Sequence, residues 1–106
     1  MCTQASSNPP GGSARLEIVS VRDDKGYPFE DVLIQIRNSG SGDSGSYQLT
    51  YDLQDRLGYI DQGTVTGPRV PAGSTVTFRL KTGYGCNEGT AVTIIVPGQT
   101  WKGTCG

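Results

Sequence analysis

The chain has 106 residues, which is enough for one domain and too few for two. Its net charge is −1, from 9 Lys and Arg against 10 Asp and Glu, and its basic residues are scattered. This distribution argues against binding to nucleic acid or to an anionic membrane surface, because both need a clustered positive field. The chain contains no His, so the usual general base, proton shuttle and commonest metal ligand are missing.

Residues 1–14 are polar and rich in Pro, Gly and Ser, a composition that cannot bury a core. We therefore expect a flexible N-terminal tether, followed by one domain over residues 15–106. Cys2 at the front of such a tether looks like the mature end of a bacterial lipoprotein, from which a signal peptide has been cut. On this interpretation Met1 is an added start residue and Cys2 is the lipid anchor. The alternative is an unmodified Cys near a disordered end.

The first two predicted strands span residues 15–22 and 31–38. In the first, the apolar phase flips between Ile18 and Val19, which indicates a bulge or a strand that changes sheets. The second has a period of two that predicts one buried face, formed by Val32, Ile34 and Ile36. A long flexible loop is expected over residues 38–45, which are rich in Gly and Ser.

The middle of the chain predicts three further strands. Residues 46–53 show the clearest alternation, with Tyr47, Leu49, Tyr51 and Leu53 on one face. Residues 57–60 predict a short edge strand, which residues 63–67 either extend or follow as a separate strand. Residues 74–81 predict another half-buried strand.

The last segment predicts a hairpin, with strands over 90–96 and 99–104 and a turn at residues 97–98. Trp101 is expected in the core as the one indole of the chain. This hairpin brings residues near 90 opposite residues near 105, so Cys86 and Cys105 are expected to form a disulfide. A disulfide would imply an oxidising compartment; the alternative is a pair of free thiols.

About seven short strands with no convincing helix predict an all-β fold, an antiparallel β-sandwich. Two segments carry a resemblance, residues 32–40 (VLIQIRNSG) and 70–78 (VPAGSTVTF). They resemble strand ends and strand entries of bacterial immunoglobulin-like modules of the CARDB and fibronectin type III kind. The resemblance covers roughly residues 15–103 and implies an immunoglobulin-like sandwich without catalytic residues. Such modules serve as adhesion, recognition or spacer units on secreted and surface proteins.

Catalysis and metal binding have weak support. A hydrolase needs a nucleophile beside a base, and no motif supplies one. Asp52, Asp55 and Asp61 could form a carboxylate pair or bind calcium, but Asp is also a common turn residue. We therefore expect no enzyme activity, no cofactor and no metal.

The sequence favours a non-catalytic, extracytoplasmic binding or adhesion module, monomeric and held at a cell envelope or surface through Cys2. Its partner would be a protein or a glycan, and the membrane would be reached only through the lipid anchor. Three tyrosines in or near loops, Tyr27, Tyr59 and Tyr84, are the candidate contact residues. The candidate loops are 23–30 and 39–45, with 83–89 expected at the other end. The alternatives are an assembly subunit that pairs through an edge strand such as 57–61 and an immunoglobulin-like protease inhibitor.

Overall fold

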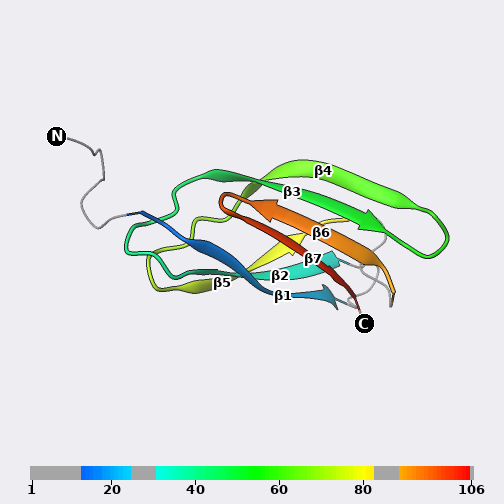
Figure 1. Ribbon diagram of the computed structural model, residues 1–106, viewed down its shortest axis with the longest axis horizontal. Helices are drawn as coiled ribbons and strands as arrows, with labels where there is room; N and C mark the ends of the chain where they lie inside the picture. The colour runs from blue at the N-terminus through cyan, green and yellow to red at the C-terminus, as the bar shows by residue number, and fades with distance from the viewer. Residues whose placement is uncertain (1–12, 25–30, 83–88, 106) are drawn as a thin grey trace.

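The computed structural model describes residues 13–24, 31–82 and 89–105 (Figure 1). In these residues the chain forms seven strands and no helix, which confirms the predicted all-β class. The strands are β1 (Leu16–Asp24), β2 (Asp31–Asn38), β3 (Tyr47–Gln54), β4 (Ile60–Gly67), β5 (Thr75–Leu80), β6 (Ala91–Val96) and β7 (Gln99–Thr104).

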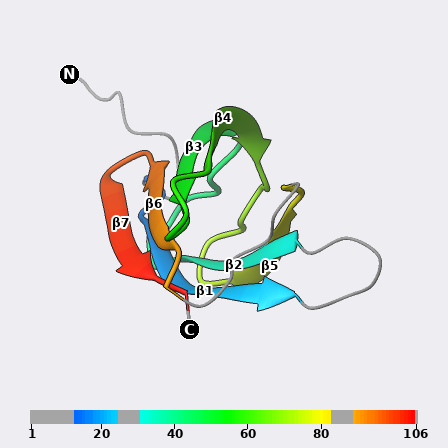
Figure 2. The same cartoon turned by 90° about the vertical axis from the view of Figure 1, so that its right-hand side faces the viewer.

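The strands form two antiparallel sheets, in the orders β1-β2-β5 and β4-β3-β6-β7. Figure 2 looks along the strands and shows the two sheets as facing layers. The fold is thus the expected immunoglobulin-like β-sandwich. Its four edges are β1 and β5 in one sheet and β4 and β7 in the other.

The core lies between the sheets and follows the period of two seen in the sequence. Alternate residues of β2 and β6 point inward and are almost completely buried, as are Leu49 and Leu53 of β3. The members from β2 and β6 are Val32, Ile34, Ile36, Val92, Ile94 and Val96. Burial of these aliphatic side chains provides the main favourable free energy of folding.

The predicted irregularity in the first strand is a β-bulge. The register of β1 against β2 shifts between Ile18 and Ser20, and Val19 is 46% exposed. The strand nevertheless stays paired with β2 along its whole length and does not change sheets. Beside the bulge, the Gln99 side chain accepts a hydrogen bond from the Ile18 N–H at 2.5 Å. This bond joins β7 to β1 and so links the two sheets.

Three sequence-based expectations need correction. The edge strand begins at Ile60 and runs without a break to Gly67, while residues 56 and 57 form a turn that Asp55 organises. Trp101 packs against the core but is only partly buried, because β7 is the last strand of its sheet. The loop over 39–45 is tied to the 69–70 segment by hydrogen bonds rather than left free.

Candidate functional surfaces

One end of the sandwich is organised by the buried side chain of Asn38, which is 0% exposed. Its amide oxygen accepts hydrogen bonds from the Arg15 N–H at 3.0 Å and the Gly40 N–H at 2.9 Å. Its amide nitrogen donates to the Gly42 carbonyl at 2.7 Å and the Val70 carbonyl at 2.9 Å. All four hydrogen-bonding positions of the amide are therefore filled, as a buried polar group requires.

The backbone of Asn38 extends the same connection. Its N–H donates to the Ser74 carbonyl at 2.9 Å, and its carbonyl accepts from the Gly73 N–H at 2.8 Å. The two segments that carry the family resemblance, 32–40 and 70–78, thus meet at this residue. Residue 38 falls on the same face of β2 as the buried residues Val32, Ile34 and Ile36, because every second residue of the strand points inward. This alternation is the sequence signal that predicts the burial of Asn38.

Two glycines allow this end to close, for different reasons. Gly73 has a φ of 75°, a left-handed conformation that side chains disfavour. Gly40 is needed for space, because a Cβ there would lie 2.6 Å from the Arg15 nitrogen and closer still to the Ser13 carbonyl. Residues 13–15, which lead into β1, therefore pass directly against Gly40.

The loop at the same end is fixed by polar contacts. Ser44 donates its N–H to the Val70 carbonyl at 3.1 Å and accepts the Val70 N–H on its hydroxyl at 2.8 Å. Asp43 accepts a hydrogen bond from the Gly45 N–H and pairs with Arg69 at 2.9 Å. The Gly45 N–H and then Arg69 lower the pKa of the Asp43 carboxyl.

The opposite end carries the hairpin tip, defined as residues 55–60, which are the turn after β3 and the first residue of β4. The Asp55 carboxylate accepts two backbone hydrogen bonds, from the Leu57 N–H and the Tyr59 N–H, both at 2.9 Å. The Asp55 N–H donates to the Tyr59 carbonyl at 3.0 Å, and Gly58 adopts a φ of 92°. These bonds fix the backbone, as expected for an Asp that caps a turn.

The hairpin tip exposes a cluster of large apolar side chains. Leu57 is 83% exposed, Tyr59 57% and Ile60 54%, the three highest values among the large hydrophobic residues described. The Arg56 side chain lies against Gly89, next to the start of β6. The predicted exposure of Tyr59 is confirmed, whereas the exposure of Leu57 and Ile60 was not predicted from the sequence.

The other predicted contact residues, Tyr27 and Tyr84, lie outside the described residues. Residues 24 and 31, which flank the first of these segments, pair with each other at the end that holds the hairpin tip. Val32 pairs with Leu80, which places the chain leading into the second segment at that end too. The 39–45 loop lies at the far end, so the expected grouping of 23–30 with 39–45 is wrong.

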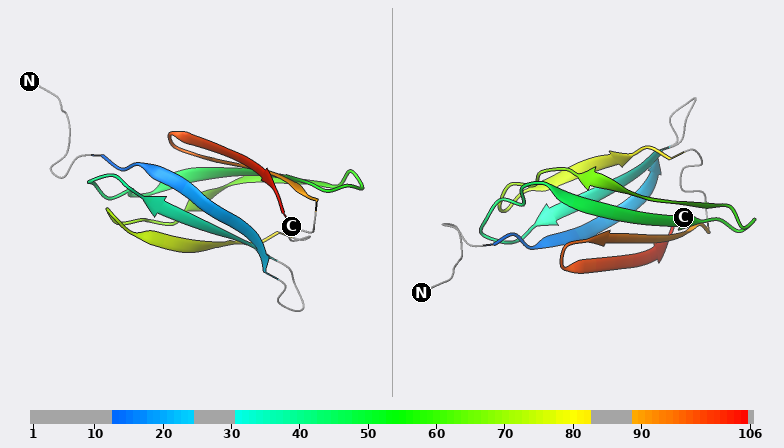
Figure 3. Two further views of the ribbon diagram at one scale, coloured as in Figure 1. Left: turned by 60° about the horizontal axis from the view of Figure 1, so that its bottom comes forward. Right: turned by 90° about the horizontal axis from the view of Figure 1, so that it is seen from above.

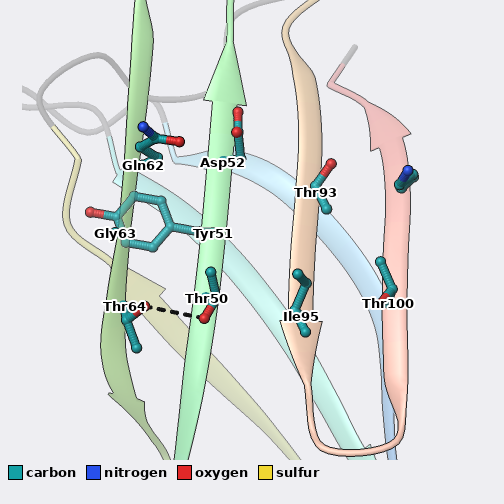
Figure 4. Close-up of a pocket in the computed structure, with 10 residues that line it drawn as sticks. Thr50, Tyr51, Asp52, Gln62, Gly63, Thr64, Thr93, Ile95 and Thr100 are labelled. Atoms are coloured by element: carbon teal, nitrogen blue, oxygen red, sulfur yellow. Dashed lines mark hydrogen bonds between the residues drawn. The ribbon is translucent and has the colours of Figure 1, made fainter.

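A shallow groove of about 540 Å³ crosses the outer face of the four-stranded sheet (Figure 4). Polar side chains from all four strands line it, among them Gln62, Asp52, Thr93 and Lys102. The Thr50 and Thr64 hydroxyls share a hydrogen bond at 3.2 Å, drawn as a dashed line in Figure 4. The groove is open to solvent along the face of the sheet.

On the inner face, two tyrosines of β3 cover two glycines of β4. Tyr51 pairs with Gly63 and Tyr47 with Gly67, and a Cβ on Gly67 would overlap the Tyr47 ring. The Tyr47 hydroxyl is buried without a hydrogen-bond partner among the described residues, and burial raises its pKa to about 12. Burial, followed by the charge of Asp61, raises the pKa of Tyr51.

The three aspartates considered for carboxylate or calcium chemistry do not share a site. Asp52 lines the outer groove, Asp61 lies on the inner side of β4, and the Asp55 carboxylate is used by the hairpin tip. In the part of the chain that the structure describes, no three acidic or Cys side chains are grouped to hold a metal ion.

The predicted register around Cys105 is confirmed. Its N–H donates to the Thr90 carbonyl at 3.0 Å, its carbonyl accepts from Gly89, and its side chain is buried. Cys86 and Cys2 lie outside the described residues, so the disulfide and the lipid anchor stay predictions.

No family model, curated protein or solved structure matches this chain. Within the described segments, no helix has the length and apolar character needed to cross a bilayer.

Proposed function

We propose that this chain is a non-catalytic binding or adhesion module that acts outside the cytoplasm, held at a surface through Cys2. Its partner is a protein or a glycan, and the hairpin tip makes the central contact. The observation that carries the proposal is the exposed cluster of Leu57, Tyr59 and Ile60 on a backbone fixed by Asp55.

The position of the hairpin tip supports this role. Figures 1 and 3 show the start of β1 and the β3–β4 hairpin at opposite ends of the molecule in every view. A surface anchor before residue 13 would therefore leave the hairpin tip pointing away from that surface. The apolar side chains would face a partner on another cell or in the medium.

The fixed backbone conformation of the hairpin tip also favours binding. An exposed aromatic side chain on a fixed turn loses little conformational entropy when a partner covers it. Tyr is enriched among the residues that dominate binding energy, and clustered exposed apolar side chains mark interaction sites. A single-module spacer would have no need of such a cluster.

Binding can be tested with the full chain on a glycan array and on a panel of purified extracellular proteins. We expect a ligand whose affinity falls about tenfold or more in the Leu57→Ala/Tyr59→Ala variant, because central contacts are worth about 1–2 kcal/mol each. Ile95→Ala is the control, since Ile95 is an apolar residue 42% exposed on the outer face of the four-stranded sheet and pairs with Thr50, outside the hairpin tip.

Two results would contradict the proposal. Unchanged affinity in the Leu57→Ala/Tyr59→Ala variant would move the contact elsewhere, and inhibition of a protease panel without other binding would favour the inhibitor hypothesis. Surface attachment has a separate test. When the native precursor with its signal peptide is expressed in bacteria, metabolic labelling with an alkyne fatty acid should mark the chain and should not mark its Cys2→Ser variant.

A further inference from the structure

The outer edge of β4 has a row of backbone groups that its own sheet does not pair. Asp55 donates its N–H to the Tyr59 carbonyl, which makes 55/59 a hydrogen-bonded pair of the β3–β4 hairpin. Pairs alternate along an antiparallel ladder, and the register of β3 with β4 is regular over all its pairs. The odd residues of β4 therefore bond to β3, while residues 60, 62, 64 and 66 direct N–H and C=O outward.

The other three edges carry features that discourage pairing, and β4 carries few. β1 contains a bulge and contacts the Gln99 side chain, while β5 carries Arg79 and β7 carries Lys102. Residues 62–67 of β4 form an uncharged run without Pro or bulge. Bulges and edge charges are the usual protection of sheet edges, so this edge is the one open to another strand.

We propose that β4 pairs with β4 of a second copy of this chain, antiparallel and about a two-fold axis at Gly63. This register places Ile60 opposite Thr66 and Gln62 opposite Thr64, so all four outward residues of each copy are matched. Each hydrogen-bonded pair exchanges two bonds, which gives about eight across the dimer. The two four-stranded sheets become one continuous sheet.

The edge is complementary to itself in this register. The only charged residue of β4, Asp61, falls opposite Val65 of the second copy, so no like charges meet. Exposed Ile60 gains a neighbour in the methyl group of Thr66 from the second copy. A two-fold axis uses the same surface on both copies, so the pairing closes at two chains and does not propagate.

The proposal can be tested by sedimentation and by amide hydrogen exchange on the full chain. Both use the Cys2→Ser variant, because Cys2 could otherwise form disulfides between chains. A single strand pair is a small interface, so we expect a dimer with a dissociation constant on the order of 0.1 mM. Amide protection at residues 62, 64 and 66 should rise with protein concentration. Protection at residues 61, 63 and 65 should stay constant, because β3 already pairs those amides.

Thr64→Pro removes one outward N–H and the exposed Thr50–Thr64 hydroxyl bond, leaves the backbone bonds between β3 and β4 in place, and should weaken the dimer about tenfold or more. Thr100→Pro is the matched control. Thr100 lies on the opposite edge of the same sheet, and the registers of β6 and β7 direct its N–H outward too. A thermal melt of each variant shows whether it is folded.

Two double variants with introduced charges test the register of the β4–β4 pairing. They contain no Pro, so their result does not depend on whether the strand accommodates Pro. Gln62→Lys/Thr64→Lys places Lys opposite Lys across the axis and should abolish the dimer. Gln62→Lys/Thr64→Glu places Lys opposite Glu and should restore it.

Three outcomes would overturn the proposal. They are a chain that stays monomeric to about 1 mM, a dimer whose new protection lies at residues 100 and 102, and equal loss in the Thr64→Pro and Thr100→Pro variants. Dimer loss leaves ligand binding through Leu57 and Tyr59 measurable, so this proposal and the proposed function can fail separately.

Discussion

Replacing Asn38 by Ala should be among the most damaging single substitutions in this domain. The side chain fills four hydrogen-bonding positions at once, and it lies at 0% exposure between the start of β1, the 39–45 loop and the turn before β5. Alanine would leave the Arg15 and Gly40 N–H groups and the Gly42 carbonyl without the Asn38 side chain as partner, whereas the Val70 carbonyl would keep the Ser44 N–H.

The magnitude follows from the burial of the three groups that lose their partner. A buried polar group left unsatisfied costs about 1–3 kcal/mol. All three are partly buried, so water can compensate some of them, and the fully buried Val70 carbonyl keeps the Ser44 N–H as its donor. We expect a total loss of about 3–5 kcal/mol, a large share of the roughly 5–15 kcal/mol that stabilises a domain.

Urea unfolding followed by tryptophan fluorescence would measure the loss, since Trp101 packs against the core. With a slope of about 1–3 kcal/mol per molar, the midpoint should fall by roughly 2 M. Arg37→Ala is the matched control, because it removes only the exposed 3.2 Å ion pair with Glu17 and should cost under about 1 kcal/mol. A loss for Asn38→Ala no larger than for Arg37→Ala would refute the reasoning.

Three further substitutions probe the inner face and the junction between the sheets. Tyr47→Phe should leave stability unchanged or raised, because the buried hydroxyl has no partner among the described residues. Spectrophotometric titration of this variant should lose a phenol whose pKa is about 12. In the unmodified chain the raised pKa of Tyr47 means that stability is complete below pH 10 and falls as pH rises toward 12, which alkaline melts would detect. Gly67→Ala should cost about 1–3 kcal/mol by overlap with the Tyr47 ring, and a double-mutant cycle with Tyr47→Ala should show strong coupling. Gln99→Ala should cost about 0.5–1.5 kcal/mol through loss of the Ile18 bond, and equal amide exchange at Ile18 in both chains would contradict this.

The sequence predicts the strands well where one face is buried. Alternation in 31–38 and 90–104 gives boundaries that the structure reproduces, and the phase flip after Ile18 corresponds to the bulge. The prediction fails at residues 57–59, where the apolar residues suggest a strand that begins only at Ile60. The Asp55 carboxylate bonds to the backbone there and closes a turn instead, a local competition that periodicity does not detect.

The candidate surfaces are less predictable than the strands. Tyr59 could be identified as exposed from its turn, but Leu57 could not, because exposure of an apolar residue depends on the tertiary packing around it. The hydrogen bonds of Asn38 are not predictable either. Its side chain joins segments that are far apart in sequence and that only the fold brings together.

The opposite placement of residue 13 and the hairpin tip has a mechanical consequence. A force applied between an N-terminal anchor and a partner on Tyr59 would run roughly parallel to the strands (Figure 1). The hydrogen bonds between β1 and β2 lie across that direction, so the load would shear many of them together instead of opening them one at a time. The Asn38 side chain and the Ser39 N–H, both bonded to Arg15 where the force enters, would bear the load together.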